Sequence, residues 1–320
     1  MNMANQLYQW SFCVNGLFPQ YVNVENGVWL KKDQILIKSR ADDLYAYVLG
    51  NPDNRVESEA MLLAHIHLNT LVSPNHVQVS GGSGNSIDEV SELGTDKSVY
   101  FTFKENIPDQ LVQEIQDHVP TYLGRISDIA DEYLPVVSEN KFMQISLDYF
   151  YEAGIKSVTS SEGLVSIVTC LEAMFNESPG DIKYKLSLRA AFLLRAYKFD
   201  SNETFKNLKK AYDLRSKIVH GASQDKYLKE LGDLSNYARC LIKIMLVLLS
   251  NNARSSVRAG ERKNSLLREI DLTMLNPEDV DPFFDEITCG IKKLNLDVKS
   301  KFESKRQPKH ILKTILEKLP

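Results

Sequence analysis

The stretch NETFKNLKKAYDLRSKIVHG, residues 202–221, carries the strongest folding signal in this chain. Its apolar residues recur every three or four positions, which is the spacing of neighbours on a helix surface. A helix that is apolar on more than one side packs inside a bundle. The sequence therefore predicts a largely buried helix over Asn202–Val219 with two apolar stripes: Phe205, Leu208, Tyr212 and Val219 in the first, and Ala211, Leu214 and Ile218 in the second.

Arg215 interrupts the first stripe, three residues after Tyr212. A guanidinium that loses part of its hydration is tolerated only where a carboxylate, a dipole, a phosphate or a partner chain satisfies it. We expect Glu172 to hold Arg215, because it lies beside the apolar series of another predicted helix. The alternative for Glu172 is a place on the protein surface.

His220 stands where the same helix must end. Gly221 follows it, and glycine readily adopts the left-handed conformation that closes helices. An imidazole beside the last helical carbonyls suits proton transfer. Five residues at about 100° each leave Arg215 and His220 about 140° apart around the axis. The two side chains therefore meet only if the last turn tightens or if two chains share a cleft.

The run Arg215-Ser-Lys-Ile-Val-His220 resembles the R-x4-H signature of HEPN domains, and its surroundings are most similar to the ApeA-like branch of that family. The family position after the arginine is usually polar, and Ser216 occupies it here. The resemblance extends over roughly residues 138–285. Its other segments are Leu171-Glu-Ala-Met-Phe175, Lys183–Ala191 and Leu266–Pro277.

This resemblance implies an all-α bundle that forms a homodimer and cuts RNA without a metal or other cofactor. In such a reaction the 2′-hydroxyl of the RNA attacks the phosphorus, so the enzyme supplies a base, an acid and a cation for the developing charge. The expected roles are proton transfer for His220, phosphate binding for Arg215, orientation for Ser216 and positioning of Arg215 for Glu172. The products would be a 2′,3′-cyclic phosphate or 3′-phosphate and a 5′-hydroxyl, and DNA would resist cleavage.

A structural role is the alternative interpretation of the same residues. The arginine and the histidine then belong to a buried polar network with Glu172, as perturbed charged groups often do. The protein would be a catalytically silent HEPN dimer that binds RNA or a protein partner as a scaffold. A metal-dependent hydrolase is a third hypothesis, which predicts that a chelator stops any activity.

Positive charge gathers around the motif. The whole chain has a net charge of −4, yet residues 183–217 contain ten Lys and Arg against three acidic residues. Clustered cations attract polyanions and make their binding depend on salt. The alternative is that amphipathic helices simply expose their lysines to water. The residues that we expect to bind RNA are Lys183, Lys185, Arg189, Lys209, Lys210 and Lys217.

Residues 1–107 alternate short β-rich segments with turn signals and contain one helical segment, Glu57–Leu71. This pattern predicts a small α+β domain, which we expect to act as a sensor or regulatory module of unknown ligand. The glycine-rich run Ser80–Ser86 lacks the ending of a phosphate-binding loop and is interpreted as a flexible turn. The predicted strands are Tyr8–Val14, Gly27–Lys31, Ile35–Lys38, Leu44–Leu49, Val77–Ser80 and Val99–Lys104.

The pattern becomes helical after Pro108. Residues 108–252 are predicted to form the HEPN-type bundle and residues 253–320 a helical C-terminal extension with a basic amphipathic end. Asp181 and Asp200 are expected to cap helices. Besides Asn202–Val219, the predicted helices are Asp109–Tyr133 with a break near Pro120, Asn140–Ala153, Glu162–Asn176, Asp181–Tyr197 and Lys226–Leu249.

Composition indicates a cytoplasmic protein. The chain is 43% hydrophobic and 25% charged, which supplies a sizeable core, and its apolar stretches are too short to span a bilayer. The start of the sequence lacks the pattern of a secretory signal. The four cysteines show no metal-binding spacing and are expected to be thiols. His65 and His67 diverge by about 200° on a helix, which disfavours chelation.

Together these features give a hypothesis: an N-terminal α+β domain joined to a dimeric HEPN endoribonuclease. By analogy with the family, the role would be antiviral (anti-phage) defence or toxin-like arrest of translation, with a protein inhibitor or trigger as a further partner.

Overall fold

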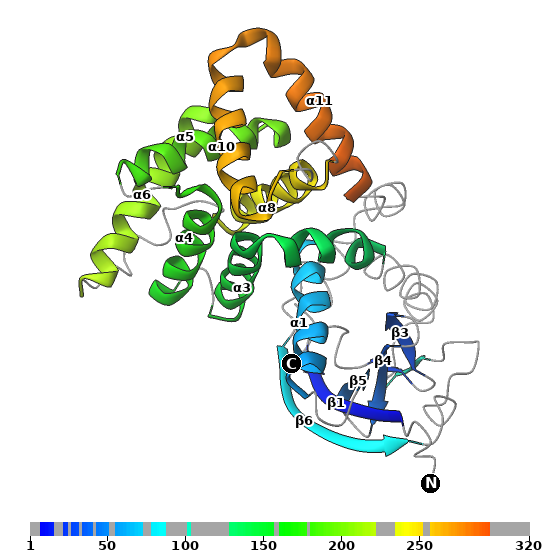
Figure 1. Ribbon diagram of the computed structural model, residues 1–320. Helices are drawn as coiled ribbons and strands as arrows, with labels where there is room; N and C mark the ends of the chain where they lie inside the picture. The colour runs from blue at the N-terminus through cyan, green and yellow to red at the C-terminus, as the bar shows by residue number, and fades with distance from the viewer. Residues whose placement is uncertain are drawn as a thin grey trace.

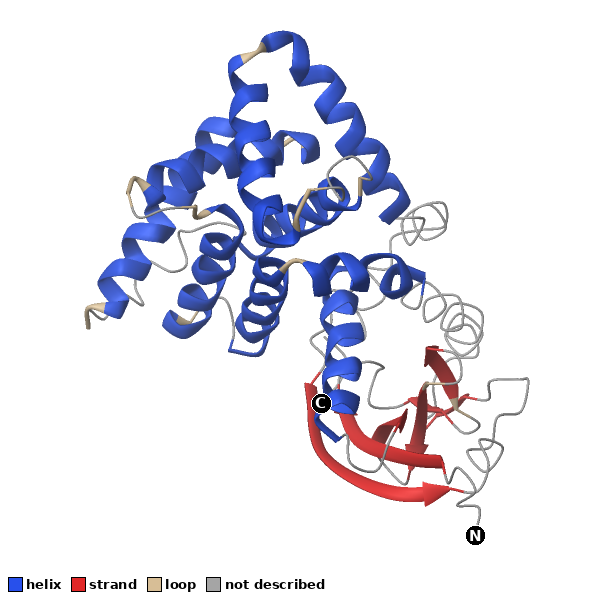
Figure 2. Ribbon diagram, viewed as in Figure 1, coloured by secondary structure: helices blue, strands red, loops and turns tan. Residues whose placement is uncertain are grey.

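The computed structural model describes residues 7–15, 22–24, 27–31, 34–40, 43–50, 55–72, 78–87, 101–103, 128–156, 160–177, 180–221, 234–251 and 257–294. An N-terminal antiparallel sheet with one helix is followed by a mainly helical region (Figures 1 and 2). The predicted fold class is therefore confirmed.

The N-terminal sheet is antiparallel, and its strands are arranged in the order β3-β4-β5-β1-β6. Helix α1, Arg55–Val72, packs on it, and its Leu62 and Ile66 join a core that includes Phe12 and Val48 of the sheet. A separate pair consists of β2, Val22–Val24, and β7, Phe101–Phe103. The five strands of the main sheet are β1 Leu7–Asn15, β3 Val28–Lys31, β4 Ile35–Arg40, β5 Asp43–Gly50 and β6 Gln78–Ile87.

The glycine-rich run is part of a strand, so its interpretation as a flexible turn is wrong. Residues 80–86 lie inside β6 and pair with β1. Gly81 has a φ of +73°, and β6 carries one extra residue against β1 at this point, as in a glycine bulge. At Gly84 a Cβ would lie 2.5 Å from the ring of Tyr8. The glycines therefore permit a bulge and a close ring contact, which turn statistics do not reveal.

The helical region is built around α8, which is buried along almost its whole length. Asp200 caps α6 as predicted, since its carboxylate accepts from the Glu203 N–H at 2.8 Å. Asp181 occupies the N-cap position of α5 as predicted, with a φ of 49°, but its side chain makes no capping hydrogen bond. The helices are α3 Lys141–Lys156, α4 Ser161–Phe175, α5 Ile182–Leu194, α6 Ser201–Val219, α8 Leu234–Ser250, α10 Ala259–Leu275 and α11 Pro277–Leu294, with a 3-10 turn, η2, at Arg195–Tyr197.

Three helix predictions fall partly or wholly outside the described residues. The helix expected over residues 109–133 is described only from 128 and continues to 139. Of the helix expected over 226–249, residues 234–250 are described. The basic amphipathic end at 309–319 lies outside the described residues.

Helices α10 and α11 complete the core of the helical region. Their Leu266, Ile270 and Ile287 belong to the same apolar cluster as α3, α4 and α8, so the boundary predicted at 252/253 does not separate two cores. Gly290 of α11 permits close packing, because a Cβ there would collide with Val247 of α8. In Figure 1 the two helices form a hairpin that arches over α8.

Helix α1 connects the two parts of the molecule. Its Leu68 is buried in the core of the helical region, whereas Leu62 and Ile66 pack on the sheet. One turn of α1 also contacts α3: His67 Nδ1 lies 3.2 Å from Asp148 Oδ1, and the His67 ring packs against the ring of Tyr151, with centroids 4.4 Å apart and planes tilted by 34°. Figure 1 shows α1 between the sheet and the bundle.

None of the four cysteines takes part in a disulfide, as predicted. Burial raises the pKa of the Cys170 thiol far above its ordinary value. In the described part of the chain, no helix has the length and hydropathy needed to cross a bilayer.

Candidate functional site

Arg215 and Glu172 come together where α6 packs on α4. Arg215 Nη2 lies 3.3 Å from Glu172 Oε2, and the two side chains are 27% and 17% exposed. The sequence prediction that Glu172 holds Arg215 therefore names a pair that is in contact. Both charges are partly desolvated, so each depends on its partner more than a surface ion pair does.

Tyr212 is a second hydrogen-bond partner of the Glu172 carboxylate. Burial raises the pKa of Tyr212, and the charge of Glu172 and a hydrogen bond to it raise that pKa further. The neutral phenol thus donates to Glu172 from one turn before Arg215. From the sequence, Tyr212 was assigned only to an apolar stripe. The residues near Tyr212 do not indicate that its hydroxyl meets a carboxylate on another helix.

The guanidinium of Arg215 is incompletely satisfied. Its Nε is buried and has no hydrogen-bond partner among the described residues. A buried N–H without an acceptor is costly, and protein structures seldom keep one without a reason. Because this atom is itself buried, an acceptor from outside reaches it only after the Arg215 side chain moves.

His220 ends α6 as predicted. It is the C-cap residue, its N–H donates to the Ser216 and Ile218 carbonyls, and Gly221 follows with a φ of +89°. The imidazole is exposed and Ser216 is half-buried. No described hydrogen bond or ion pair joins the side chains of Arg215 and His220, in keeping with their separation of about 140° around the helix.

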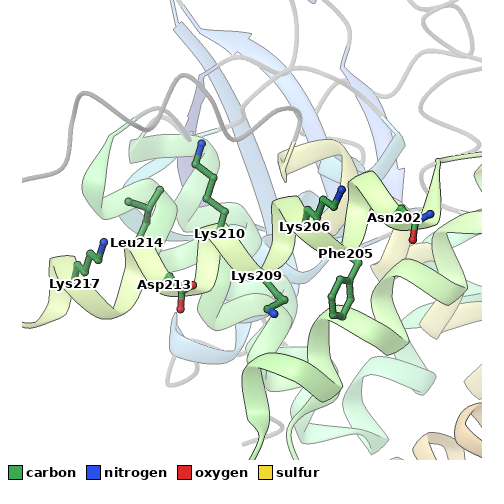
Figure 3. Close-up of a pocket in the computed structure, with 8 residues that line it drawn as sticks. All are labelled: Asn202, Phe205, Lys206, Lys209, Lys210, Asp213, Leu214 and Lys217. Carbon is green, nitrogen blue, oxygen red and sulfur yellow. The ribbon is translucent and has the colours of Figure 1, made fainter.

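A groove of about 970 Å³ runs along α6 (Figure 3). Lys209, Lys210 and Lys217, three of the residues predicted to bind RNA, line it, and so do Lys206 and Phe205, which were not assigned to binding from the sequence. The signal was present, since residues 206, 209, 210, 213 and 217 recur at helical spacing. The groove holds four lysines and one aspartate, which makes it strongly positive.

The aspartate of the groove is partly neutralised. Lys183 of α5 reaches across to Asp213 of α6, with Nζ 2.9 Å from Oδ1. Lys183 therefore borders the groove by way of this pair, whereas Lys185 is exposed on α5 without contacting it. The pair is exposed on both sides and adds little to stability.

Arg189 is buried and does not belong to the RNA-binding set. Only 2% of it is exposed, and its guanidinium donates to both carboxylate oxygens of Asp271, to Glu177 and to the Phe175 carbonyl. The expectation that Arg189 contacts RNA is therefore wrong. Its charge is paired with carboxylates inside the bundle, where the side chain joins α5 to α10 and to the end of α4.

The helical period separates the two candidate groups. At about 100° per residue, Lys209, Asp213, Lys217 and His220 fall within about 80° of arc, and Arg215 lies on the opposite side of α6. The basic groove thus leads towards His220, while Arg215 faces α4. Joining Arg215 and His220 around one phosphate requires a second chain or a shift of the last turn.

Searches for similar families, curated proteins and solved structures found no match. Over the described ranges, no three His, Cys, Asp or Glu side chains gather as a metal site requires.

Proposed function

We propose that this protein is an RNA-binding, metal-independent endoribonuclease of the HEPN type. The observation that carries the proposal is the arrangement on α6: an exposed histidine at its C-terminal end, a basic groove leading towards that histidine, and an arginine with an unused N–H. His220 would transfer protons, and Arg215 would bind the phosphate as its charge builds.

The positions of Arg215 and His220 favour a shared site in a homodimer. The two side chains lie about 140° apart on one helix. A two-fold axis beside the end of α6 would bring the histidine of one chain to the arginine of the other, because such an interface uses the same patch twice. Glu172 would act as the positioning residue of Arg215, and Ser216 would orient the phosphate or the imidazole.

Cleavage of a labelled RNA in excess chelator tests the proposal. The protein should leave 2′,3′-cyclic phosphate or 3′-phosphate ends, and Arg215→Ala and His220→Ala should each reduce cleavage at least a hundred-fold. A 2′-deoxy nucleotide at the cleavage position should block it, because the nucleophile is missing. A double variant in the exposed lysines of α11, Lys292→Gln with Lys293→Gln, is the control and should cut normally.

Mixing the two inactive variants tests the shared site. A dimer of one Arg215→Ala chain and one His220→Ala chain retains one complete arginine–histidine pair, so part of the activity should return. If mixing restores nothing while each parent dimerises, the two groups do not act across subunits. Activity that disappears in chelator alone would point instead to a metal-dependent hydrolase.

A silent HEPN scaffold is the second candidate, and the ion pair favours it. Arg215 is held by Glu172 and faces away from His220, as a purely structural arginine would. Such a protein would bind RNA or a protein partner in the groove and cut nothing. Binding without cleavage under all the conditions above selects the scaffold. A role in anti-phage defence, with an inhibitor or trigger protein, belongs to the endoribonuclease proposal.

A further inference from the structure

Two aromatic rings border the basic groove at the start of α6. Phe205 lines the groove, and the ring of Tyr184 on α5 meets it edge to face, with centroids 5.7 Å apart and planes at 82°. Tyr184 is 53% exposed, so part of its ring is accessible from solvent. Leu188, one turn along α5, is 38% exposed and extends the apolar surface.

Positive charge lies directly against one of these rings. Lys209 Nζ stands 5.3 Å from the centroid of Phe205, and Lys206 and Lys210 line the same groove. Residues 206–217 span about 16 Å at the rise of an α-helix, which suits a run of phosphates better than a single anion. Exposed rings that continue into a lysine-lined groove have the two properties that bind single-stranded nucleic acid.

We infer that Tyr184 and Phe205 form a base-stacking platform, and that the groove of α6 binds the backbone of single-stranded RNA running from the platform towards His220. This inference rests on the proposed function for the identity of the ligand and adds a binding subsite to it. A paired base keeps its faces covered by its neighbours, so a double helix offers nothing to the platform. The lysines bind phosphates whatever the sequence, and the rings select unpaired bases.

The experiment measures binding without cleavage. A fluorescent 2′-O-methyl RNA of twelve nucleotides has no free 2′-hydroxyl, so its fluorescence anisotropy reports affinity even if the protein cuts RNA, and failure of the cleavage proposal leaves the result intact. The comparison ligands are the same strand in a duplex, an abasic strand of equal length and polyglutamate of equal charge. The single strand should bind most tightly.

Tyr184→Leu is the decisive variant. It should weaken binding of the single strand about tenfold, as expected for the loss of one stacked base, and should leave the abasic strand unaffected. Tyr184→Phe keeps the ring and should restore the affinity. Because Tyr184 is exposed, these variants should fold normally, which circular dichroism checks.

Lys206→Gln with Lys210→Gln should weaken the single strand and the abasic strand alike and reduce the salt dependence of both. Lys292→Gln with Lys293→Gln on α11 should change neither. The inference is overturned if Tyr184→Leu binds like the parent or if the duplex binds as tightly as the single strand. Equal affinity for polyglutamate would also overturn it, and would identify the groove as a site for an acidic protein.

Discussion

Two arginines of the bundle meet carboxylates in opposite ways. Arg189 is 2% exposed and makes four hydrogen bonds, two of them to Asp271. Arg215 is 27% exposed, has one carboxylate at 3.3 Å and keeps a buried Nε without a partner among the described residues. Arg189 is therefore satisfied by its own fold, whereas Arg215 is not.

The difference separates a structural cation from a candidate functional one. A fully bonded guanidinium inside a protein fixes the elements around it, and here it joins α4, α5 and α10. An incompletely bonded one keeps donors ready for an anion, at some loss of stability. Sequence alone gives the same description of both residues, an arginine among apolar neighbours on a helix.

The largest effect we expect is on the activity of the Arg215→Ala variant. RNA cleavage should fall a hundred- to a thousand-fold, as for the loss of one group that stabilises transition-state charge. The free energy of unfolding should fall by about 1–2 kcal/mol, less than for a fully buried pair, because Glu172 loses its cation but both side chains are still partly exposed. Single-turnover cleavage and urea unfolding of the same sample measure both quantities. If Arg215→Ala loses much of its stability while the folded protein cleaves RNA at the normal rate, Arg215 is a structural arginine like Arg189.

The next effect is on stability. Arg189→Ala should lower the free energy of unfolding by about 3 kcal/mol, because it leaves Asp271, Glu177 and the Phe175 carbonyl without their common donor. Urea unfolding at neutral pH measures the change, and Arg215→Ala is the matched control. If both variants lose the same free energy of unfolding, the larger number of hydrogen bonds made by Arg189 does not make it the more stabilising of the two arginines.

Glu172→Gln should reduce cleavage about tenfold. The amide keeps the size of the side chain and an acceptor for Tyr212, but it no longer pairs with the charge of Arg215, so the guanidinium is less often in place. A positioning role predicts a lower kcat with little change in KM. Glu162→Gln, in the exposed first turn of the same helix, is the control and should be unaffected. Faster cleavage by Glu172→Gln would mean that the carboxylate restrains Arg215.

Local signals predicted much of the fold and one contact of the site. The bounds of α6, its cap at Asp200 and its end before Gly221 follow from periodicity and capping, which depend on a few neighbouring residues. The Arg215–Glu172 pair was predictable because an arginine in an apolar stripe demands a carboxylate. The partner of Arg189 was not predictable, because Asp271 lies 82 positions further along the chain and no signal near Arg189 identifies it.

The role of the glycine-rich run and the place of Phe205 beside the groove were also not predicted from the sequence. Gly81 and Gly84 predict a turn from composition, yet a bulge and the ring of Tyr8 place them inside a strand. Phe205 was assigned to the apolar stripe, and only its packing against Tyr184 places it beside the groove. In both cases a partner from another element decides the role of the residue.

The smallest effect concerns Lys263, beside Arg189. Its Nζ donates to the Ala173 carbonyl at 2.7 Å, and burial lowers its pKa to about 8; nearby Glu177 opposes this and Arg189 adds to it. When the pKa of a lysine is lower in the folded state than in the unfolded state, protonation of that lysine destabilises the fold. This loss of stability is absent above the unfolded-state pKa and is complete below the folded-state pKa.

The stability of the protein relative to Lys263→Met should therefore rise as pH increases from about 8 to about 10.5. We expect a gain of about 1 kcal/mol, because the ammonium is still partly solvated and screening reduces the full effect. Urea unfolding of the two proteins across that range measures it, and the difference between them cancels the titration of tyrosines. A difference that is flat or falls with pH would show that Lys263 keeps its proton over this range. The positive charges of Lys263 and Arg189 at the end of α4 would then both be stabilised by the fold, unlike that of Arg215.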